Sequence, residues 1–332
     1  MTADRSTVAV LGAGNMGTAL GQVIASNGHE VRLWSIEADV LEEIQHQHRN
    51  TKYLEGIHLH PNVTASWDMA EAVKGAGLVI VSVPSQVVGP LARDLASSLS
   101  RDQAVLNVAK GLEGDTHRRM SEALSAAAPG SKQRIGSMGG PAIAIEMARG
   151  LPMAIIIGIP DTKACSSAQA IIQNDHLKVE TTTDVVGLEL CATLKNVYAI
   201  ALGICDGLGY GTNTKAFLAT VALREMAAIA SALGGRDETV FGLAGLGDLL
   251  TTGFSSHSRN RTLGEKLGAA GDWQLFLRTN TVEGVAACRA ISELIEGRGL
   301  AAHLLDTLRE VLFDERPAPE AVRHFLAAFS FG

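Results

Sequence analysis

The chain has 332 residues, of which 46% are hydrophobic and 19% charged, so it is long enough for two domains with sizeable cores. Its formal net charge of −7 argues against a general nucleic-acid binder, and an anionic substrate would need a local group of basic residues. We find no basic-then-apolar leader and no apolar run of the roughly 18 residues that span a membrane, so no membrane span is expected.

A glycine-rich turn joins the first predicted strand, residues 8–11, to the first predicted helix. Gly12, Gly14 and Gly17 have the G-x-G-x-x-G spacing of the dinucleotide fingerprint. Gly12 permits the turn, Gly14 lets a pyrophosphate approach the backbone, and Gly17 lets the helix pack close to the strand. The helix N-terminus also offers N–H groups to phosphates. Because a strand precedes the turn and a helix follows, we favour dinucleotide binding over a turn that binds nothing.

The second predicted strand, residues 30–34, bears on the choice of coenzyme. NAD-preferring proteins carry an acidic residue at the end of this strand, about 20 residues after the glycines. Here Trp34, Ser35 and Ile36 occupy the strand end, and Glu37 lies slightly beyond it. No arginine pair is present to hold a 2′-phosphate. We therefore expect NAD or NADP as cofactor, with weak discrimination between them.

Strands and helices alternate through the N-terminal half, which is typical of a doubly wound parallel sheet. Further strands are expected over residues 77–83, 104–109, 134–137 and 154–157, with an exposed helix over 39–47 and a short one over 67–74. From about residue 183 only helical patterns remain, at 185–204, 214–233, 283–296, 303–313 and 319–329. We predict a dinucleotide-binding domain over residues 1–183 and an all-α substrate and catalytic domain over 184–332.

Histidines and cysteines are the residue types that most often bind metals, but their spacing in this chain does not favour a metal site. The histidines form two H-x-H pairs without carboxylate or cysteine company, so a polar surface segment is the favoured interpretation: His46, His48, His58 and His60. The four cysteines have no C-x-x-C spacing and are expected to be small core residues in a reducing cytoplasm: Cys165, Cys191, Cys205 and Cys288. We predict no metal.

Lys195 lies in an almost wholly apolar predicted helix. One helical turn away stand Cys191 and Tyr198, and no carboxylate is among its neighbours. The lysine could reach the surface along its methylene stem. We favour a lysine at the edge of a buried cleft, where partial desolvation would lower its pKa and allow proton exchange near neutral pH.

Two later segments carry further polar chemistry. Residues 242–248 contain three glycines among apolar residues and end at Asp248. They follow a predicted helix, so they do not form a second dinucleotide turn, and a flexible linker is the alternative. Ser258, Arg259 and Asn260 precede a helical segment and could form a phosphate cradle or a solvated helix start.

The chain resembles the prokaryotic type of NAD(P)-dependent glycerol-3-phosphate dehydrogenase over essentially its whole length. The motifs that carry the resemblance are GAGNMG at 12–17, VPS at 83–85, AKGLE at 109–113, GGP at 139–141, GLEL at 187–190, LKN at 194–196, DGLG at 206–209, GLAGLGD at 242–248, SRNR at 258–261 and VEG at 282–284. The resemblance implies a Rossmann-type domain followed by a helical domain like that of 6-phosphogluconate dehydrogenase.

The resemblance also implies roles for individual residues. Lys195 would be the general acid/base, and the substrate would be held by Lys110, Gly140, Ala142, Asp248, Ser258, Arg259 and Asn260. The coenzyme would contact Gly12, Gly14, Asn15, Met16, Gly17, Lys110, Ala144, Arg259 and Glu283. Gly139 and Ala142 replace hydroxyl residues of the family, so only backbone contacts survive there, and Ile36 replaces a frequent arginine or histidine.

The resulting hypothesis is reversible hydride transfer between NAD(P)H and dihydroxyacetone phosphate, giving sn-glycerol 3-phosphate for phospholipid synthesis. Lys195 would protonate the developing alkoxide, Lys110 would stabilise its charge, and Asp248 would orient Lys195 or bind a substrate hydroxyl. One alternative is a dehydrogenase of another small hydroxy acid on the same scaffold. The other is a dinucleotide-sensing protein without turnover. The expected partners are a small phosphorylated substrate and a second copy of the chain in a cytoplasmic homodimer.

Overall fold

The computed structural model describes residues 5–114 and 116–330, which form two units. The first unit extends to Glu113 and continues from Arg118 to Val185, and the second contains residues 114–117 and the chain from Val186 onward. From the sequence we place the domain boundary after residue 183, and the excursion at 114–117 is not visible in the sequence pattern.

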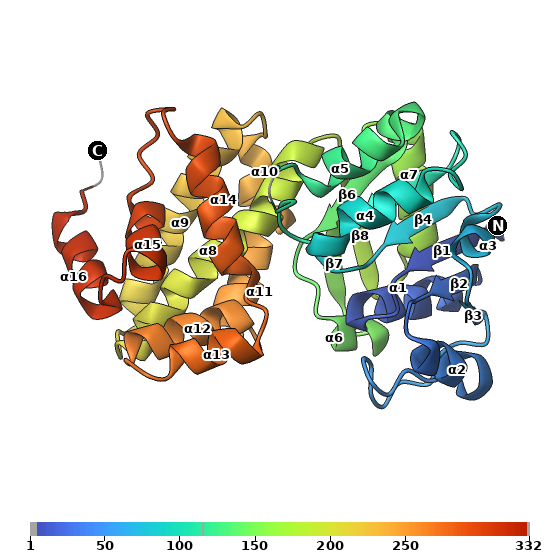
Figure 1. Ribbon diagram of the computed structural model, residues 1–332, viewed down its shortest axis with the longest axis horizontal. Coiled ribbons are helices and arrows are strands. Elements are labelled where there is room, and N and C mark those ends of the chain that lie inside the picture. Colours follow the sequence, from blue (N-terminus) through green and yellow to red (C-terminus); the bar gives the residue numbers. More distant parts are fainter. Residues whose placement is uncertain (1–4, 115, 331–332) are drawn as a thin grey trace. The chain divides into compact units, whose positions relative to one another are not determined.

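The first unit is built on an eight-stranded sheet with the order β3-β2-β1-β4-β5-β6-β7-β8 (Figure 1). The strands are β1 (Thr7–Leu11), β2 (Glu30–Trp34), β3 (Val63–Ser66), β4 (Leu78–Val81), β5 (Ala104–Asn107), β6 (Ile135–Gly139), β7 (Met153–Gly158) and β8 (Leu177–Thr182). Strands β6 and β7 pair antiparallel, whereas the other neighbours pair parallel, so the expectation of a wholly parallel sheet is wrong at this one pairing.

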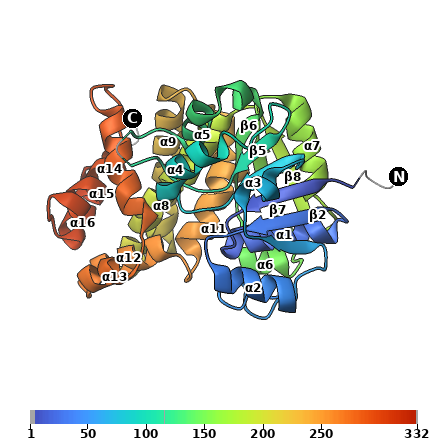
Figure 2. The same cartoon turned by 45° about the vertical axis from the view of Figure 1, so that its right-hand side comes forward.

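Helices cover both faces of this sheet. They are α1 (Asn15–Ser26), α2 (Ala38–Gln47), α3 (Met69–Val73), α4 (Ser85–Leu95), α5 (Met120–Ala127), η1 (Pro129–Arg134), α6 (Ala144–Ala148) and α7 (Thr162–Ile172). Figure 2 shows α1, α2 and α6 along one side of the strands and α4 and α5 along the other. The predicted doubly wound Rossmann-type architecture is confirmed.

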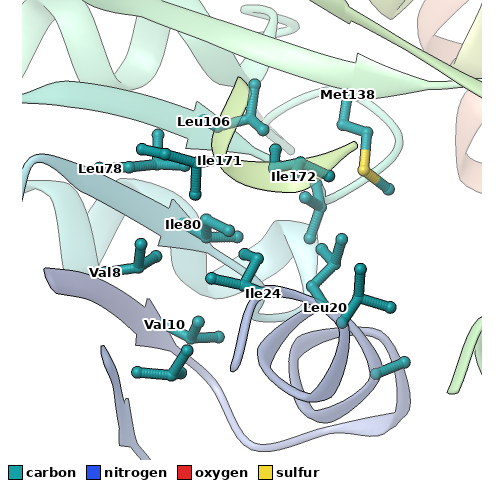
Figure 3. Close-up of a cluster of buried hydrophobic side chains, with 14 of the residues drawn as sticks. Val8, Val10, Leu20, Ile24, Leu78, Ile80, Leu106, Met138, Ile171 and Ile172 are labelled. Carbon is teal, nitrogen blue, oxygen red and sulfur yellow. The ribbon is translucent and has the colours of Figure 1, made fainter. Parts of the chain in front are cut away.

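Alternation along the strands produces two cores. Val8 and Val10 of β1 face one side, where they meet Leu20 and Ile24 of α1 (Figure 3). Ala9 and Leu11 face the other side, in the core completed by α3, α4 and α5. Because successive side chains of a strand point to opposite faces, a strand covered by helices on both faces is apolar throughout, as residues 8–11 are.

The second unit is helical in the residues described. Its helices are α8 (Val185–Gly207), α9 (Thr212–Ala232), α10 (Asp237–Phe241), the π-helical turn η2 (Leu243–Gly247), α11 (Asp248–Phe254), α12 (Arg259–Gly268), α13 (Trp273–Thr279), α14 (Glu283–Ile295), α15 (His303–Phe313) and α16 (Ala318–Ala328). Within the described ranges, α8 is the one helix long and apolar enough to cross a membrane, and 94% of that stretch is buried inside the protein. Helix α8 is therefore a core helix.

Helices α8 and α12 pack backbone to backbone through glycines. A Cβ atom on Gly203 would lie 2.0 Å from the carbonyl oxygen of Arg261, and one on Gly264 would lie 2.0 Å from that of Ile200. Neither position leaves room for a side chain. This contact fixes the start of α12 relative to the helix that carries Lys195.

The structure corrects several details of the element assignment. Helix α2 is not simply exposed, because it buries Val40, Leu41 and Ile44, of which Val40 and Ile44 pack into the first core. Strands β3 and β8 and helices α10, α11 and α13 are absent from the sequence assignment, whereas α12 is the helical segment expected after Ser258. These elements are short or polar, so their stability comes from tertiary packing more than from a local pattern.

Candidate functional site

The glycine turn after β1 has the geometry that its sequence predicts. Gly12 adopts a φ of +118°, and a Cβ there would lie 2.2 Å from the carbonyl oxygen of Ser82. A Cβ on Gly17 would lie 2.0 Å from the carbonyl oxygen of Gly12. At Gly14 the corresponding Cβ would meet no atom within 4 Å. Two glycines thus allow close packing, and the third leaves open space in front of the backbone.

The start of α1 completes this turn. Gly14 is the N-cap of α1, and no side chain caps the helix there, so its first N–H groups can meet an anion. Asn15 is exposed, and Met16 is half-buried against the core of the first unit. The open space, the uncapped N–H groups and the position at the carboxyl end of β1 all fit the pyrophosphate of a dinucleotide.

Asn50 holds the glycine turn from outside the motif, and sequence reasoning missed it. Its side chain is buried and donates to the carbonyl oxygen of Ala13 and to the hydroxyl of Thr18, both at 2.8 Å. The Thr18 hydroxyl itself donates to the Ala13 oxygen at 3.1 Å. Its partners lie more than 30 residues away in the sequence, so no local sequence signal identifies it.

The remaining predicted residues of the first unit lie at the carboxyl ends of β5 and β6. Lys110 follows β5 and is half-buried. Gly140 follows β6 with a φ of +94°, Ala142 is half-buried, and Ala144 begins α6. Ala142, Ala144 and Met16 pack against the same core cluster, so the structure brings the β6–α6 connection close to the start of α1.

In the second unit Lys195 meets a carboxylate and a hydroxyl from α11. Its Nζ donates to Asp248 Oδ1 at 2.7 Å and to Thr252 Oγ1 at 2.7 Å. The side chains of Lys195 and Asp248 are 7% and 2% exposed, so this is a buried ion pair. The lysine therefore does not extend to the surface as the alternative interpretation would have it. Thr252 was not anticipated, although it stands one helical turn after Asp248.

Hydrogen bonds through two buried amide side chains link two more of the predicted residues, Asn260 and Glu283. Asn260 Nδ2 donates to Asn196 Oδ1, and Asn196 Nδ2 donates to Glu283 Oε2, both at 3.0 Å. The N–H of Gly284 donates to Asn260 Oδ1 at 2.9 Å. Asn196 immediately follows Lys195, so the network joins α8 to the starts of α12 and α14. Asn196 was quoted as part of a motif, but its linking role is visible only in the structure.

Ser258 and Arg259 form the start of α12. The Ser258 side chain is the N-cap and accepts from the N–H of Arg261 at 3.2 Å, so its hydroxyl is engaged in capping. Arg259 is exposed, whereas Asn260 is 7% exposed. Arg261 forms an ion pair with Asp206, in which its Nε donates to Asp206 Oδ2 at 2.7 Å. An exposed guanidinium at a helix N-terminus is a favourable arrangement for binding a phosphate.

The histidine pairs lie on α2 and the loop after it. His46 is paired with Glu42 at 3.2 Å, and the rings of His48 and His58 meet edge to face with centroids 6.2 Å apart. Over the described part of the chain, no three His, Cys, Asp or Glu side chains are placed to share a metal ion. All four cysteines are buried, and burial raises the pKa of the Cys205 thiol to about 11 and that of Cys288 to about 12.

Known proteins match nearly the whole length of this chain. Residues 7–165 match the N-terminal family of NAD-dependent glycerol-3-phosphate dehydrogenase, and residues 184–323 match its C-terminal family. The glycerol-3-phosphate dehydrogenase [NAD(P)+] of Clostridium perfringens (strain SM101 / Type A) is 35% identical, with 96% of each chain covered. That of Geobacillus thermodenitrificans (strain NG80-2) is 38% identical, covering 96% of this chain and 94% of the relative.

A solved structure supports the same assignment. The crystal structure of glycerol-3-phosphate dehydrogenase from Coxiella burnetii superposes with a TM-score of 0.89 at 30% identity, covering 97% of this chain and 99% of that one. The fingerprint turn, the Lys195–Asp248 pair and these matches lead to one conclusion: the chain belongs to the NAD-dependent glycerol-3-phosphate dehydrogenase family.

Proposed function

We propose that this chain interconverts dihydroxyacetone phosphate and sn-glycerol 3-phosphate, with Lys195 as the general acid/base. The bound nicotinamide coenzyme supplies the hydride that reduces C2 of the ketone and takes it back in the reverse direction. Family membership supports the reaction. The observation that carries the residue assignment is the buried contact of Lys195 Nζ with Asp248 and Thr252.

The environment of Lys195 suits the proton-transfer step. The ammonium donates one proton to the C2 oxygen as this oxygen gains negative charge, which leaves a neutral amine beside Asp248. The Asp248 carboxylate holds the lysine Nζ in place, and Thr252 fixes the amine from a second direction. In the reverse direction the neutral amine accepts the hydroxyl proton.

The start of α12 is the proposed phosphate subsite. Arg259 is exposed there, next to the first N–H groups of a ten-residue helix. Asn260 keeps this helix start in register with α8 through Asn196. The phosphate is remote from C2, so the free energy of its binding would serve to position the reacting carbonyl.

For the coenzyme we propose the residues named from the resemblance. In the first unit these are Gly12, Gly14, Asn15, Met16, Gly17, Lys110 and Ala144, and in the second unit Arg259 and Glu283. Lys110, Gly140, Ala142, Asp248 and Ser258 remain proposed substrate residues. The open space at Gly14 supports the pyrophosphate position, and the capping role of Ser258 limits that residue to an indirect contribution.

The decisive experiment mixes the purified protein with dihydroxyacetone phosphate and NADH or NADPH and follows the absorbance of the reduced nicotinamide. Consumption of the coenzyme supports the proposal. Turnover of a non-phosphorylated hydroxy acid in preference would favour the first alternative, and coenzyme binding without turnover would favour a dinucleotide sensor. The buried lysine argues against the sensor, because coenzyme binding alone does not require it.

We propose three further properties. The product supplies glycerol 3-phosphate for phospholipid synthesis. The enzyme works in the cytoplasm, a proposal supported by the four buried cysteines, which form no disulfide with one another. The protein forms a homodimer, which sedimentation analysis would measure directly.

A further inference from the structure

The end of β2 and the loop after Asn50 converge on the glycine turn. The N–H of Gly12 donates to the carbonyl oxygen of Trp34, the last residue of β2, at 2.8 Å. Asn50 ties its loop to the carbonyl oxygen of Ala13 in the same turn. Glu37 lies three residues beyond Trp34, and Lys52 lies two residues beyond Asn50. Both therefore lie within a few residues of anchors on the coenzyme turn.

Glu37 and Lys52 are joined directly. The Lys52 ammonium donates to Glu37 Oε1, with the two side chains 49% and 28% exposed. Hydrogen bonds from Lys52 and then Tyr53 lower the pKa of the Glu37 carboxyl, so it is ionised at neutral pH. Glu37 occupies the N-cap position of α2, yet its side chain makes no capping bond and is turned to Lys52 instead.

Glu37 lies just beyond β2, the region in which doubly wound folds bind the adenosine ribose of a dinucleotide. In the doubly wound fold an acidic group beyond β2 receives the 2′-hydroxyl of NAD, and a cation there accommodates the 2′-phosphate of NADP. This chain has both, engaged with each other, and Ile36 beside them is exposed and carries no charge. The strand end itself has no acid, which is why the sequence alone predicts weak discrimination.

We infer that the Glu37–Lys52 pair determines the coenzyme preference of this enzyme and favours NAD(H) over NADP(H). The inference rests on the proposed function. The pair is neutral as a whole, and a ribose 2′-hydroxyl can donate to Glu37 without breaking it. A 2′-phosphate brings a charge of about −2 beside the Glu37 carboxylate. Lys52 could leave Glu37 for the phosphate, but the carboxylate would then face the phosphate without its cation.

The nearby charges add to this preference. Asp39 lies in the first turn of α2 and acts on Glu37 as a second negative charge. Glu37, Asp39 and Lys52 together carry a net charge of −1, which disfavours a nearby phosphate.

Substitutions of Glu37 and Lys52 are expected to change the preference for NADH over NADPH in opposite directions. Glu37→Gln removes the repulsion and releases Lys52, so the NADH/NADPH ratio of kcat/KM should fall by about tenfold or more. Lys52→Gln removes the only cation of the pair, so this ratio should rise by several-fold, mainly through weaker NADPH binding. Dissociation constants of both coenzymes, measured by nicotinamide fluorescence without substrate, should shift in the same directions.

Glu42→Gln is the matched control. Glu42 lies on the same helix and is paired with His46, so its substitution removes an equal charge without touching Lys52. The control should leave the ratio unchanged. The inference is overturned if Glu37→Gln and Lys52→Gln both leave the ratio of dissociation constants unchanged, or if both move it in one direction. Failure of every variant and of the wild type to turn over dihydroxyacetone phosphate would instead count against the proposed function, because the binding titrations do not depend on it.

Discussion

Lys195 of α8 and Asp248 of α11 are 53 residues apart in sequence, and their charged atoms lie 2.7 Å apart inside the second unit. Both side chains are almost fully buried. The free energy needed to remove two charges from water often exceeds the attraction between them. Removing one partner leaves the other charge buried without a counter-charge. A pair of this kind is poorly explained by stability alone, which favours a chemical role.

The first prediction concerns the amine itself. Lys195→Met keeps the length and apolar stem of the side chain but deletes the proton-carrying group. We expect kcat to fall by about 10²–10⁴, the range for a lost proton-transfer group. Coenzyme binding should persist, because the glycine turn lies in the other unit. Steady-state assays with dihydroxyacetone phosphate measure kcat. Fluorescence titration of NADH measures coenzyme binding separately.

The same substitution tests the burial of the pair. Lys195→Met should lower the free energy of unfolding by about 3–5 kcal/mol, because Asp248 loses its cation. The double variant Lys195→Met with Asp248→Leu should recover much of this loss and remain inactive. A folded Lys195→Met protein with near-wild-type turnover would exclude the proposed mechanism.

The second prediction concerns Thr252, whose hydroxyl accepts from Lys195 Nζ at 2.7 Å. Thr252→Val keeps the shape but removes the acceptor, so the amine loses one of the contacts that orient it. We expect kcat to fall by about tenfold, the equivalent of one hydrogen bond to a charged group, with little change in KM. Thr252→Ser retains the hydroxyl and should restore most of kcat. Equal activity of the valine and serine variants would show that the hydroxyl is not needed.

The third prediction concerns the phosphate of the substrate. Arg259→Ala removes an exposed guanidinium at the start of α12 and should raise KM for dihydroxyacetone phosphate by about 10–100-fold, from a lost charged contact of about 1.5–3 kcal/mol. Because Arg259 is exposed, its substitution should leave the thermal unfolding temperature nearly unchanged. Lys266→Ala, at the other end of α12, is the control and should have a normal KM. An unchanged KM in Arg259→Ala would remove the phosphate subsite from α12.

The first unit was the more predictable part of the molecule. Residues 8–11 are apolar on both faces, and the glycines after them have spacings that few other turns require, so the strand, turn and helix follow from local pattern. Strand β3 was not predicted because it has only four residues, and the alternation of Val63 and Ala65 with Thr64 and Ser66 is too short to distinguish a strand from a loop. The antiparallel pairing of β6 and β7 was not predicted, because amino-acid composition does not indicate the direction of a strand.

The site in the second unit was predictable as a set of residues but not as contacts. Lys195 stood out because no carboxylate lies within one helical turn of it. For Asp248 the sequence left two roles open, orienting Lys195 or binding a substrate hydroxyl. Only the packing of α11 against α8 brings Asp248 and Thr252 to the amine. Asn50 and Asn196 act through buried hydrogen bonds between distant segments, and a single sequence carries no local signal for such bonds.

The last prediction concerns Glu225, a buried carboxylate on α9. Glu225 of α9 is 6% exposed and accepts from the N–H groups of Leu304 and Leu305, at 2.7 and 3.1 Å, and from the Tyr198 hydroxyl at 2.9 Å. Burial raises the pKa of Glu225 above its usual 4.5, against the opposing effect of these hydrogen bonds. The folded protein therefore holds this proton at pH values where the unfolded chain has released it.

The sign of the pH dependence follows from this difference. Between the ordinary pKa of 4.5 and the raised folded pKa, the folded state binds more protons than the unfolded state, so the contribution of Glu225 to stability falls as pH rises through that window. Glu225→Gln is neutral throughout and lacks this contribution. We expect the free energy of unfolding of wild type minus that of Glu225→Gln, from urea titrations at pH 7, 6 and 5, to move in favour of wild type as pH falls. A difference that stays constant, or that moves the other way, would show that the hydrogen bonds from Leu304, Leu305 and Tyr198 outweigh the burial of the charge.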